Sequence, residues 1–162
     1  TLSDTSSKTN SEGEATITLT STKKAVDDIL VSAQYAGTDK VDAGSLVSFI
    51  ADEASAAITA SVLDNGKILT PADGKTHYQV SVSVKDQFGN VLKNYQLTVT
   101  SPVLSEPQTL STDVNGNVIT DISSLIAGSS EVLITSTTNP AVKTNVTLKY
   151  SIAELNLTNP PL

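Results

Sequence analysis

Several residue types that carry protein chemistry are absent from this sequence. The 162-residue chain contains no cysteine, methionine or tryptophan, and all ten of its basic residues are lysines. Without cysteine there can be no disulfide, thiolate nucleophile or thiolate metal ligand. Without arginine the chain lacks the planar donor fork that recognises phosphate and guanine.

The charge is also one-sided. A net charge of −7 and a pI near 4.5 mean that nucleic acids and anionic membrane surfaces repel the chain at long range. No stretch approaches the ~18–20 apolar residues that span a bilayer. We therefore expect no nucleic-acid partner, no cofactor and no direct membrane insertion.

The absence of cysteine is typical of bacterial proteins that fold outside the cell. The chain opens with Thr1-Leu2-Ser3-Asp4 and shows no signal peptide, so the export signal is expected upstream and the chain is expected to be a fragment. Aromatic residues make up only 4% and apolar residues 38%. A core built from Val, Ile, Leu and Ala suits a thin sandwich of two sheets.

Apolar and polar residues alternate strictly in several places, which is the signature of half-buried strands. Many of the apolar members are β-branched, and this favours a pleated surface. The alternating runs are Ala15–Thr20, Val80–Val84, Leu97–Thr100, Val132–Thr135 and Val142–Leu148.

Glycine turns separate these runs. They occur at 64–67, 72–75, 87–90 and 114–117, where a Gly stands beside Asn, Asp or Phe. Pro102 and Pro107 bracket a bend or an edge, because proline cannot donate to a strand ladder. No segment has a sustained helical period, and the sequence predicts an all-β fold.

An internal repeat divides the chain. Leu46-Val47-Ser48-Phe49-Ile50-Ala51-Asp52 resembles 148–154, roughly 100 residues later. The segment 10–18 likewise resembles 113–120, and Thr1-Leu2-Ser3 resembles Thr109-Leu110-Ser111. We therefore predict three parts: the C-terminal half of a first module at 1–52, a complete second module at 53–152, and a linker or first strand of a third at 153–162.

An isolated half sandwich leaves strand edges and one core face open. Two explanations follow. Either upstream strands cover the face, or another molecule does. The sequence does not choose between them.

The segment 72–90 resembles a bacterial Ig-like module of the intimin/invasin family. It has an Ala-Asp-Gly turn, Tyr78 with alternating valines, and an Asp-x-x-Gly-Asn turn ending at Asn90. The segments 13–22 and 29–33 resemble late strands of the same family. The segment 117–122 departs from the family pattern, so the late strand of the second copy is placed less firmly.

The resemblance implies immunoglobulin-like β-sandwich modules in tandem, at the cell surface. Such modules hold a distal binding domain away from an outer-membrane anchor, which here would lie outside this fragment. The implied partners are neighbouring modules of the same chain and a host-cell surface or matrix protein. The resemblance transfers no receptor-binding residue.

Candidate sites have simpler structural interpretations. His77 is the single histidine and has no partner nearby in sequence, so a strand residue beside a loop is expected rather than a metal or catalytic group. Residues 113–117 resemble the start of a calcium loop. However, Gly116 stands fourth and Ser124 twelfth, where an EF-hand needs Gly sixth and Glu twelfth, so a hairpin turn is predicted.

A calcium ion between modules is a further hypothesis, because Asp52, Glu53 and Asp86 could meet at a junction. The adjacent pair Asp27-Asp28 would point to opposite faces of a strand, so a solvated loop is expected. Asn145 and Asn156 begin glycosylation sequons, which a bacterial surface protein would leave bare.

The larger side chains are expected at the edges of the core. Tyr78, Tyr95 and Tyr150 each lie on a predicted strand, where the ring fills the core edge and the hydroxyl bonds to backbone. Phe88, in a turn, is predicted to contact a neighbouring module.

Two functions remain open for a chain that shows no nucleophile–base set and is expected not to be an enzyme. The first is a stalk segment that acts as a spacer in a surface adhesin. The second is a module that itself binds a host protein or glycan through a loop or sheet edge. A third interpretation is an accessory β domain of a secreted polysaccharide-acting enzyme or a phage virion protein.

Overall fold

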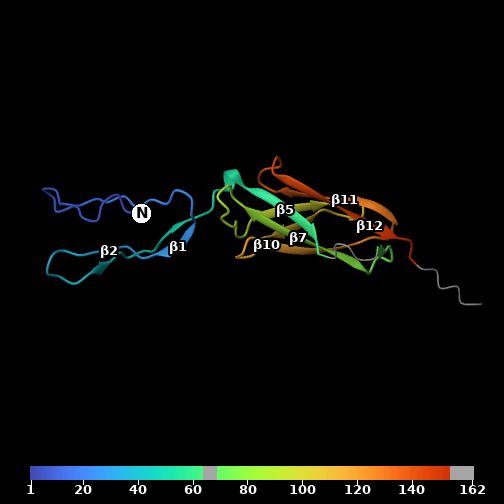
Figure 1. Ribbon diagram of the computed structural model, residues 1–162, viewed down its shortest axis with the longest axis horizontal. Coiled ribbons are helices and arrows are strands. Elements are labelled where there is room, and N and C mark those ends of the chain that lie inside the picture. Colours follow the sequence, from blue (N-terminus) through green and yellow to red (C-terminus); the bar gives the residue numbers. More distant parts are fainter. Residues whose placement is uncertain (64–68, 154–162) are drawn as a thin grey trace, which may run out of the picture. The chain divides into compact units, whose positions relative to one another are not determined.

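The computed structural model describes residues 1–63 and 69–153, and the chain separates into two compact units. Unit 1 comprises Thr1–Ala51 and unit 2 comprises Asp52–Leu162 (Figure 1). Within the described ranges, the only helical element is the 3-10 turn η1 (Glu53–Ser55). The predicted all-β class is confirmed. The assignment of the parts to a half module, a complete module and a connector remains a prediction.

Unit 2 is a sandwich of two sheets. The three-stranded sheet has the order β10-β7-β5, and all its pairs are antiparallel. It consists of β5 (Ala57–Val62), β7 (His77–Lys85) and β10 (Asn117–Ser123). The prediction was least firm for the late strand at 117–122, and β10 covers it in full.

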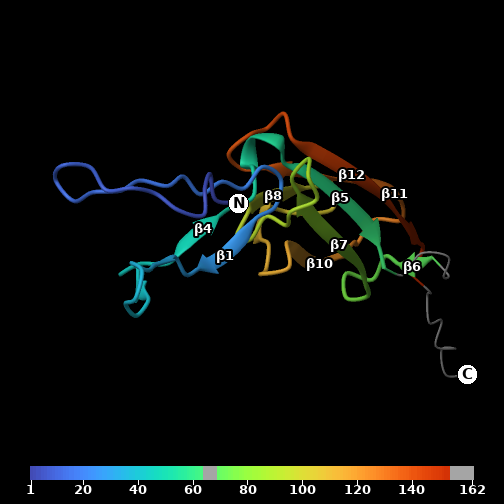
Figure 2. The same ribbon diagram turned by 60° about the vertical axis from the view of Figure 1, so that its left-hand side comes forward.

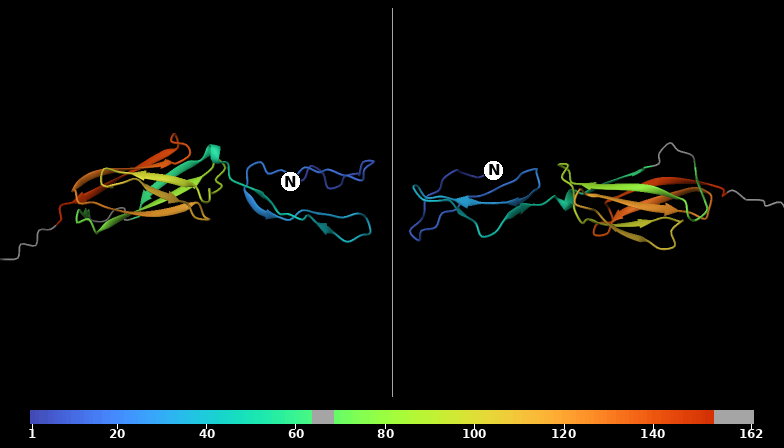
Figure 3. Two further views of the ribbon diagram at one scale, coloured as in Figure 1. Left: turned by 180° about the vertical axis from the view of Figure 1, so that it is seen from behind. Right: turned by 90° about the horizontal axis from the view of Figure 1, so that it is seen from below.

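The second sheet of unit 2 has the order β6-β12-β11-β8-β9. Among the residues that the structure describes, the one parallel pair of this sheet joins β12 to the two-residue strand β6. The members are β6 (Thr70–Pro71), β8 (Gln96–Thr100), β9 (Gln108–Ser111), β11 (Gly128–Ser136) and β12 (Lys143–Ser151). Figure 3 shows the two layers facing each other.

The core of unit 2 follows from the period-2 alternation. In β7 the residues Tyr78, Val80, Val82 and Val84 are buried, while the side chains between them face outward. Buried residues of the other strands in both sheets complete the core: Leu97, Val99, Ile122, Val132, Ile134, Leu148 and Tyr150. Each buried aliphatic side chain stabilises the fold by about 1.5–3 kcal/mol, so this stripe is the main driving force for folding.

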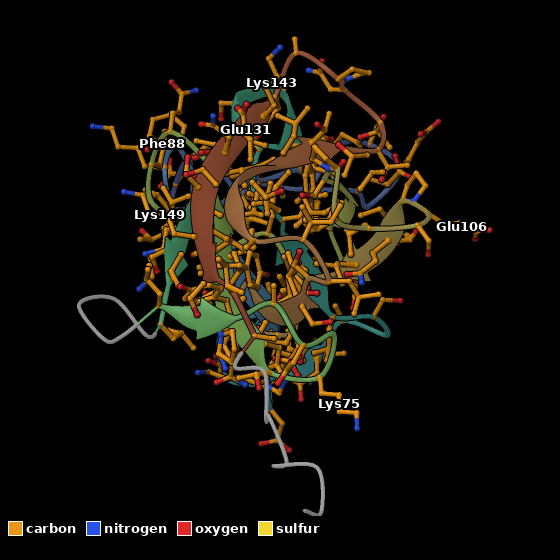
Figure 4. All side chains as sticks on the ribbon, turned by 90° about the vertical axis from the view of Figure 1, so that its right-hand side faces the viewer. Lys75, Phe88, Glu106, Glu131, Lys143 and Lys149 are labelled. Atoms are coloured by element: carbon orange, nitrogen blue, oxygen red, sulfur yellow. The ribbon has the colours of Figure 1, made fainter. Side chains whose placement is uncertain are left out.

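The outward-facing residues of unit 2 are mostly polar. In the view of Figure 4, Lys75, Glu106, Lys143 and Lys149 project away from the ribbon, as does Phe88. Apolar side chains are exposed as well, including Leu125 and Ile126, which follow β10.

Unit 1 consists of short strands without a core. β1 (Val26–Ile29) pairs with β4 (Val47–Phe49), and β2 (Ser32–Ala33) pairs with β3 (Val41–Asp42). These pairs form one irregular antiparallel hairpin (Figure 2). No residue of 1–51 is buried, in contrast to unit 2.

One predicted strand in unit 1 was wrong. Residues 15–20 alternate cleanly, yet their only bridge joins Leu19 to Leu2. The physical reason is the lack of a strand to pair with, because a ladder forms only where a second strand supplies donors and acceptors.

Candidate functional site

The polypeptide enters unit 2 at one end and leaves it at the other. It begins at Asp52 beside Asp86, which directly follows β7. It leaves after Ser151, whose carbonyl accepts a hydrogen bond from Ala72, five residues before β7 begins. The figures likewise place η1 and the end of β12 at opposite ends of the sandwich (Figures 1 and 3). The nine residues of β7 therefore separate the two points by roughly 30 Å, at about 3.3 Å per residue.

A single carboxylate holds the first residue of unit 2. Oδ2 of Asp86 accepts hydrogen bonds from the backbone N–H of Asp52 at 3.1 Å and from the Asn90 side chain at 2.8 Å. Oδ1 accepts from the backbone N–H groups of Phe88 at 2.8 Å and Asn90 at 2.9 Å. The carboxylate thus joins the start of the chain in unit 2 to the turn that follows β7.

Further contacts surround this carboxylate. The Asp52 side chain caps η1 by accepting from the backbone N–H of Ala54 at 3.1 Å. Gln87 donates its side-chain amide to Asp52 at 3.4 Å and its backbone N–H to the Ser55 hydroxyl at 3.3 Å. We name Asp52, Ser55, Asp86, Gln87 and Asn90 the Asp86 clasp.

The local sequence explains the geometry of the clasp. Asp86-Gln87-Phe88-Gly89-Asn90 closes a tight turn in which Asp86 N–H donates to the Asn90 carbonyl at 2.9 Å. Gly89 N–H donates back to the Asp86 carbonyl at 3.0 Å, and Gly89 has a φ of +84°. A positive φ of this kind favours glycine, and an aspartate at the first position of such a turn bonds to the amides that follow it.

The Asp86 carboxylate is charged at neutral pH although only 6% of the residue is exposed. Burial alone raises the pKa of this group. The hydrogen bonds from Asn90, Asp52 and Phe88 outweigh that effect and lower the pKa from 3.8 to about 2. Hydrogen bonds that stabilise the charged form cause this depression.

The geometry favours a hydrogen-bonded clasp over the hypothesised calcium site at Asp52, Glu53 and Asp86. A carboxylate offers about four lone-pair positions, and the four N–H donors on Asp86 use that capacity. Among residues 1–63 and 69–153, no three His, Cys, Asp or Glu side chains gather as a metal group.

Comparison with known proteins identifies the family. A family model described as a bacterial Ig-like domain (group 1) matches residues 60–149, which is more than half of the chain. The chain belongs to this bacterial Ig-like family.

A solved structure described as "D0-D1 domain of Intimin" is similar to the chain. The two are 29% identical, with a TM-score of 0.50, and the similarity covers 93% of this chain and 74% of that one. The predicted resemblance to intimin/invasin modules is confirmed. No curated protein matches the chain. In the part of the chain that the structure describes, no helix is long and apolar enough to cross a membrane.

Other candidate residues of the Ig-like module have ordinary structural partners. His77 begins β7, and its Nε2 lies 3.6 Å from an Asp121 carboxylate oxygen on the outward face. Asp113 to Asn117 form the predicted turn, in which Asp113 Oδ1 accepts from the backbone N–H groups of Asn115 and Asn117. Neither arrangement brings together a catalytic group and its base.

Tyr78, Tyr95 and Tyr150 lie in the core of unit 2, and the predicted bond from hydroxyl to backbone is confirmed for Tyr78 and Tyr150 but wrong for Tyr95, whose hydroxyl bonds to a side chain. Tyr78 donates to the Lys149 carbonyl at 2.6 Å, and Tyr95 shares a hydrogen bond with Ser136 at 2.8 Å. Tyr150 donates to the Ile122 carbonyl at 2.6 Å.

The remaining candidates lie on the surface. Phe88 is 46% exposed in the turn of the Asp86 clasp, and its predicted contact with a neighbouring module stays a prediction. Asn145 bonds through its side-chain amide to Glu131 on the neighbouring strand. Asn156 lies outside the described residues. The loop expected at Asp27-Asp28 was wrong, because both residues lie in β1, where they are exposed. The register of β1 shifts here, and Asp28 has a φ of +56° and donates its N–H to the Ser48 hydroxyl.

Sequence reasoning missed the clasp itself. The Asp-x-x-Gly-Asn pattern indicated the turn, but not that its carboxylate also reaches the Asp52 N–H, 34 residues earlier in the chain. Short patterns report local bonds, whereas this contact depends on how β5 and β7 pair.

Proposed function

We propose that this chain is part of the stalk of an extracellular adhesin, in which the Ig-like module acts as a spacer. The observation that carries the proposal is the separation of the two ends of unit 2. The chain is held at Asp52 by Asp86 and leaves beyond Ser151 at the other end. A module connected in this way adds roughly 30 Å to the length of a row, by the rise of its nine-residue strand.

The Asp86 clasp supports the spacer role in a second way. A spacer transmits length only if the residues that connect it to its neighbour are fixed on the module itself. One hydrogen bond joins the Asp52 N–H to the buried Asp86 carboxylate, and three more, from Phe88 and Asn90, hold that carboxylate in place. The Asp52 side chain also caps η1. The backbone at the first residue of unit 2 is therefore held by unit 2 itself.

The surface composition also agrees with a spacer. The chain has a net charge of −7, so copies of the rod repel one another and stay soluble. Anchoring in an outer membrane by a domain outside this chain belongs to the same proposal, as do the partners, which are neighbouring Ig-like modules and a host-surface protein bound at the distal end. No catalysis is expected from this role.

Replacing the module in the parent adhesin tests the proposal. Residues 52–151 are deleted in one variant and exchanged for an unrelated Ig-like sandwich of equal length in another. We expect deletion to reduce cell adhesion and the unrelated module to restore it, because only length matters to a spacer.

The opposite result would favour a different function. If the unrelated module fails to restore adhesion while the parent reaches the surface in equal amounts, the surface of unit 2 itself is required. Direct binding of a host protein or glycan by this module would then replace the spacer role. Dose-dependent binding of the isolated chain to host cells would support the same conclusion.

A further inference from the structure

Three turns share one pattern of hydrogen bonds, at residues 10–14, 86–90 and 113–117. In each, the first residue donates its N–H to the carbonyl of the fifth, and its side-chain oxygen accepts from the third and fifth N–H groups. The fourth residue is a glycine with φ between +72° and +84°, and its N–H donates to the carbonyl of the first at 3.0–3.1 Å. The three turns therefore have one backbone geometry and differ in the side chains that they carry.

The third position, directly before the glycine, differs in chemistry. It is occupied by Glu12, Phe88 and Asn115, and all three are exposed. Of these, Asn115 carries a side-chain amide, whose carbon lies within reach of the next backbone nitrogen to close a five-membered ring. Glycine at the next position leaves that nitrogen unhindered, because it has no Cβ. The other Asn-Gly pair of the sequence, Asn65-Gly66, lies outside the described residues.

The reaction available to this pair needs only water. The backbone nitrogen of Gly116 attacks Cγ of Asn115, so that a new N–C bond forms and the bond from Cγ to Nδ2 breaks. Ammonia leaves and takes the proton of the Gly116 N–H, and a cyclic imide remains. Water then adds to one of the two ring carbonyls. The products are aspartate at position 115, or isoaspartate, in which the main chain runs through Cγ.

The closed turn opposes this reaction. The Gly116 N–H donates to the Asp113 carbonyl at 3.0 Å, and the Asn115 N–H donates to Asp113 Oδ1 at 2.8 Å. The proton that must leave is therefore held in a hydrogen bond, and the nitrogen is directed at Asp113 instead of at Cγ of Asn115. The Gly116 carbonyl also accepts from the Val84 N–H of β7 at 2.9 Å. The turn must open before the ring can close.

The isoaspartate product does not fit the native turn. It adds one methylene to the main chain, which lengthens the backbone by about 1.5 Å. Gly116 has no room to shift, because even a Cβ there would lie 2.8 Å from Val91 Cβ and 2.9 Å from the Val84 carbonyl. The bonds that join Asp113 to Gly116 and Asn117 all span the inserted atom. An isoaspartate at position 115 therefore prevents the turn from closing in its native form.

We propose that Asn115 is a site of spontaneous covalent modification that the closed turn at 113–117 guards. The side chain converts to the cyclic imide, and then to aspartate and isoaspartate, when this turn opens. The isoaspartate form keeps the turn open, so the change is irreversible and weakens the attachment of β10 to β7. This proposal is independent of the spacer role.

The rate of conversion in the folded and unfolded chain tests the proposal. The full chain is incubated at neutral pH in buffer and in urea that unfolds unit 2, and is then cut after lysine. Mass spectrometry measures conversion at each asparagine of the peptide 94–143. We expect Asn115 to convert at least roughly tenfold more slowly in buffer than in urea, because only opened turns react. In urea Asn115 should convert faster than Asn94, Asn117 and Asn139, which precede larger residues.

Two variants show whether the turn itself provides the protection. Asp113→Ala removes the side-chain acceptor but keeps the Asn115-Gly116 pair, and we expect conversion in buffer to rise several-fold toward the rate in urea. Asp73→Ala is the matched control. Asp73 accepts from the N–H groups of Lys75 and Thr76 in a different turn of unit 2, and its loss should leave the rate at Asn115 unchanged. If Asp113→Ala fails to fold, the comparison of the unaltered chain in buffer and urea still decides.

The effect of the product on the fold is measured separately. The chain is held in urea until Asn115 has converted and is then refolded. We expect it to melt at a lower temperature than Asn115→Gln after the same treatment, because glutamine does not readily close the ring. Fresh Asn115→Asp should melt as the unaltered chain does, since the side chain is exposed. This variant separates the added charge from the lengthened backbone.

Three outcomes would overturn the proposal. The first is equal conversion of Asn115 in buffer and in urea, which would show that the turn does not guard it. The second is conversion in urea no faster at Asn115 than at Asn94, Asn117 and Asn139. The third is a converted and refolded chain as stable as Asn115→Gln. None of these results bears on the adhesion assay, so failure here is distinguishable from failure of the spacer role.

Discussion

Tyr78 and Tyr150 meet edge to face inside unit 2, with ring centroids 5.3 Å apart and planes at 73°. They come from opposite sheets. The Tyr78 hydroxyl bonds to β12, the strand that carries Tyr150, and the Tyr150 hydroxyl bonds to Ile122 of β10, which lies opposite Tyr78 in the register of β10 and β7. Tyr78 accepts from Thr70 N–H and donates to Lys149, while Tyr150 donates to Ile122. This pair therefore ties the two layers together at the end where the chain leaves the module.

Removing either hydroxyl should destabilise unit 2. Tyr150→Phe leaves the buried Ile122 carbonyl without this donor, and Tyr78→Phe removes two hydrogen bonds. We expect each change to lower the free energy of unfolding by about 1–2 kcal/mol in urea titrations. Tyr35→Phe is the matched control, because Tyr35 is 80% exposed in unit 1 and should have no effect. Equal stability of all three variants would show that the hydroxyl bonds contribute nothing.

The Asp86 clasp gives a second prediction. Asp86→Asn keeps the shape of the side chain but replaces Oδ1 or Oδ2 by an NH2 group that faces N–H donors. We expect a lower melting temperature, with faster amide exchange at Asp52 where the NH2 group replaces Oδ2, or at Phe88 and Asn90 where it replaces Oδ1. Asp121→Asn, on the exposed outward face, is the control. A variant with an unchanged melting temperature and unchanged exchange at Asp52, Phe88 and Asn90 would mean that the carboxylate does not hold the start of unit 2.

The sequence predicted the sandwich well but unit 1 only in part, and the reason is physical. Alternation in β7, β8, β11 and β12 predicts strands, and those strands form because each has a partner in unit 2. The alternation in 15–20 is equally clear, but strand formation depends on a neighbour that alternation cannot report. The internal repeat predicts that 1–52 is half of a module, and a half module lacks some of the strands with which such a run would pair.

The clasp shows the same limit at a smaller scale. The turn at 86–90 follows from its Gly and Asn, which are local signals. The bond between Asp86 and Asp52 requires the antiparallel register of β5 and β7, in which Ala57 lies opposite Lys85. No pattern of neighbouring residues contains that register.

Acid and alkali should each destabilise unit 2 over a defined range. The hydrogen bonds to Asp73 from Thr76 and Lys75 lower its pKa to about 2, and the pKa of Asp86 is also about 2, compared with 3.8 for an ordinary aspartate. As pH falls below about 4, the unfolded chain takes up these protons first. The stabilisation is therefore fully present above pH 4 and is lost between about pH 4 and pH 2.

At alkaline pH the dependence is reversed, and the stability of unit 2 falls as the pH rises. Burial, together with the nearby Tyr78, raises the pKa of Tyr150 from 10.0 to about 12. The unfolded chain loses this proton first, so stability is full below pH 10 and declines as the pH rises to about 12. Unfolding titrations across both ranges check the prediction. Asp86→Asn should make the acid loss smaller, with the part due to Asp73 remaining, and leave the alkaline range unchanged. Tyr150→Phe should remove the alkaline loss and leave the acid range unchanged.

Two glycines with the same backbone conformation should respond differently to substitution. Gly89 and Gly116 have φ of +84° and +72°, so alanine at either position costs about 1–2 kcal/mol for the left-handed conformation. A Cβ at Gly89 meets open space, but at Gly116 it lies 2.9 Å from the Val84 carbonyl and 2.8 Å from Val91 Cβ. These are backbone and branch-point atoms, which cannot move aside as the end of a long side chain can.

We therefore expect Gly116→Ala to destabilise unit 2 by a further ~1–3 kcal/mol relative to Gly89→Ala, as overpacking does elsewhere. Urea unfolding of the two variants measures the difference. Gly74→Ala tests whether the mobility of the contacted atom matters as well as its distance. A Cβ there would lie 2.6 Å from Cδ2 of Leu125, which is the end of an exposed side chain. Leu125 can rotate away, so Gly74→Ala should resemble Gly89→Ala. If it were as damaging as Gly116→Ala, closeness alone would determine the cost, and the fixed position of the Asp113 turn against β7 would not be the cause.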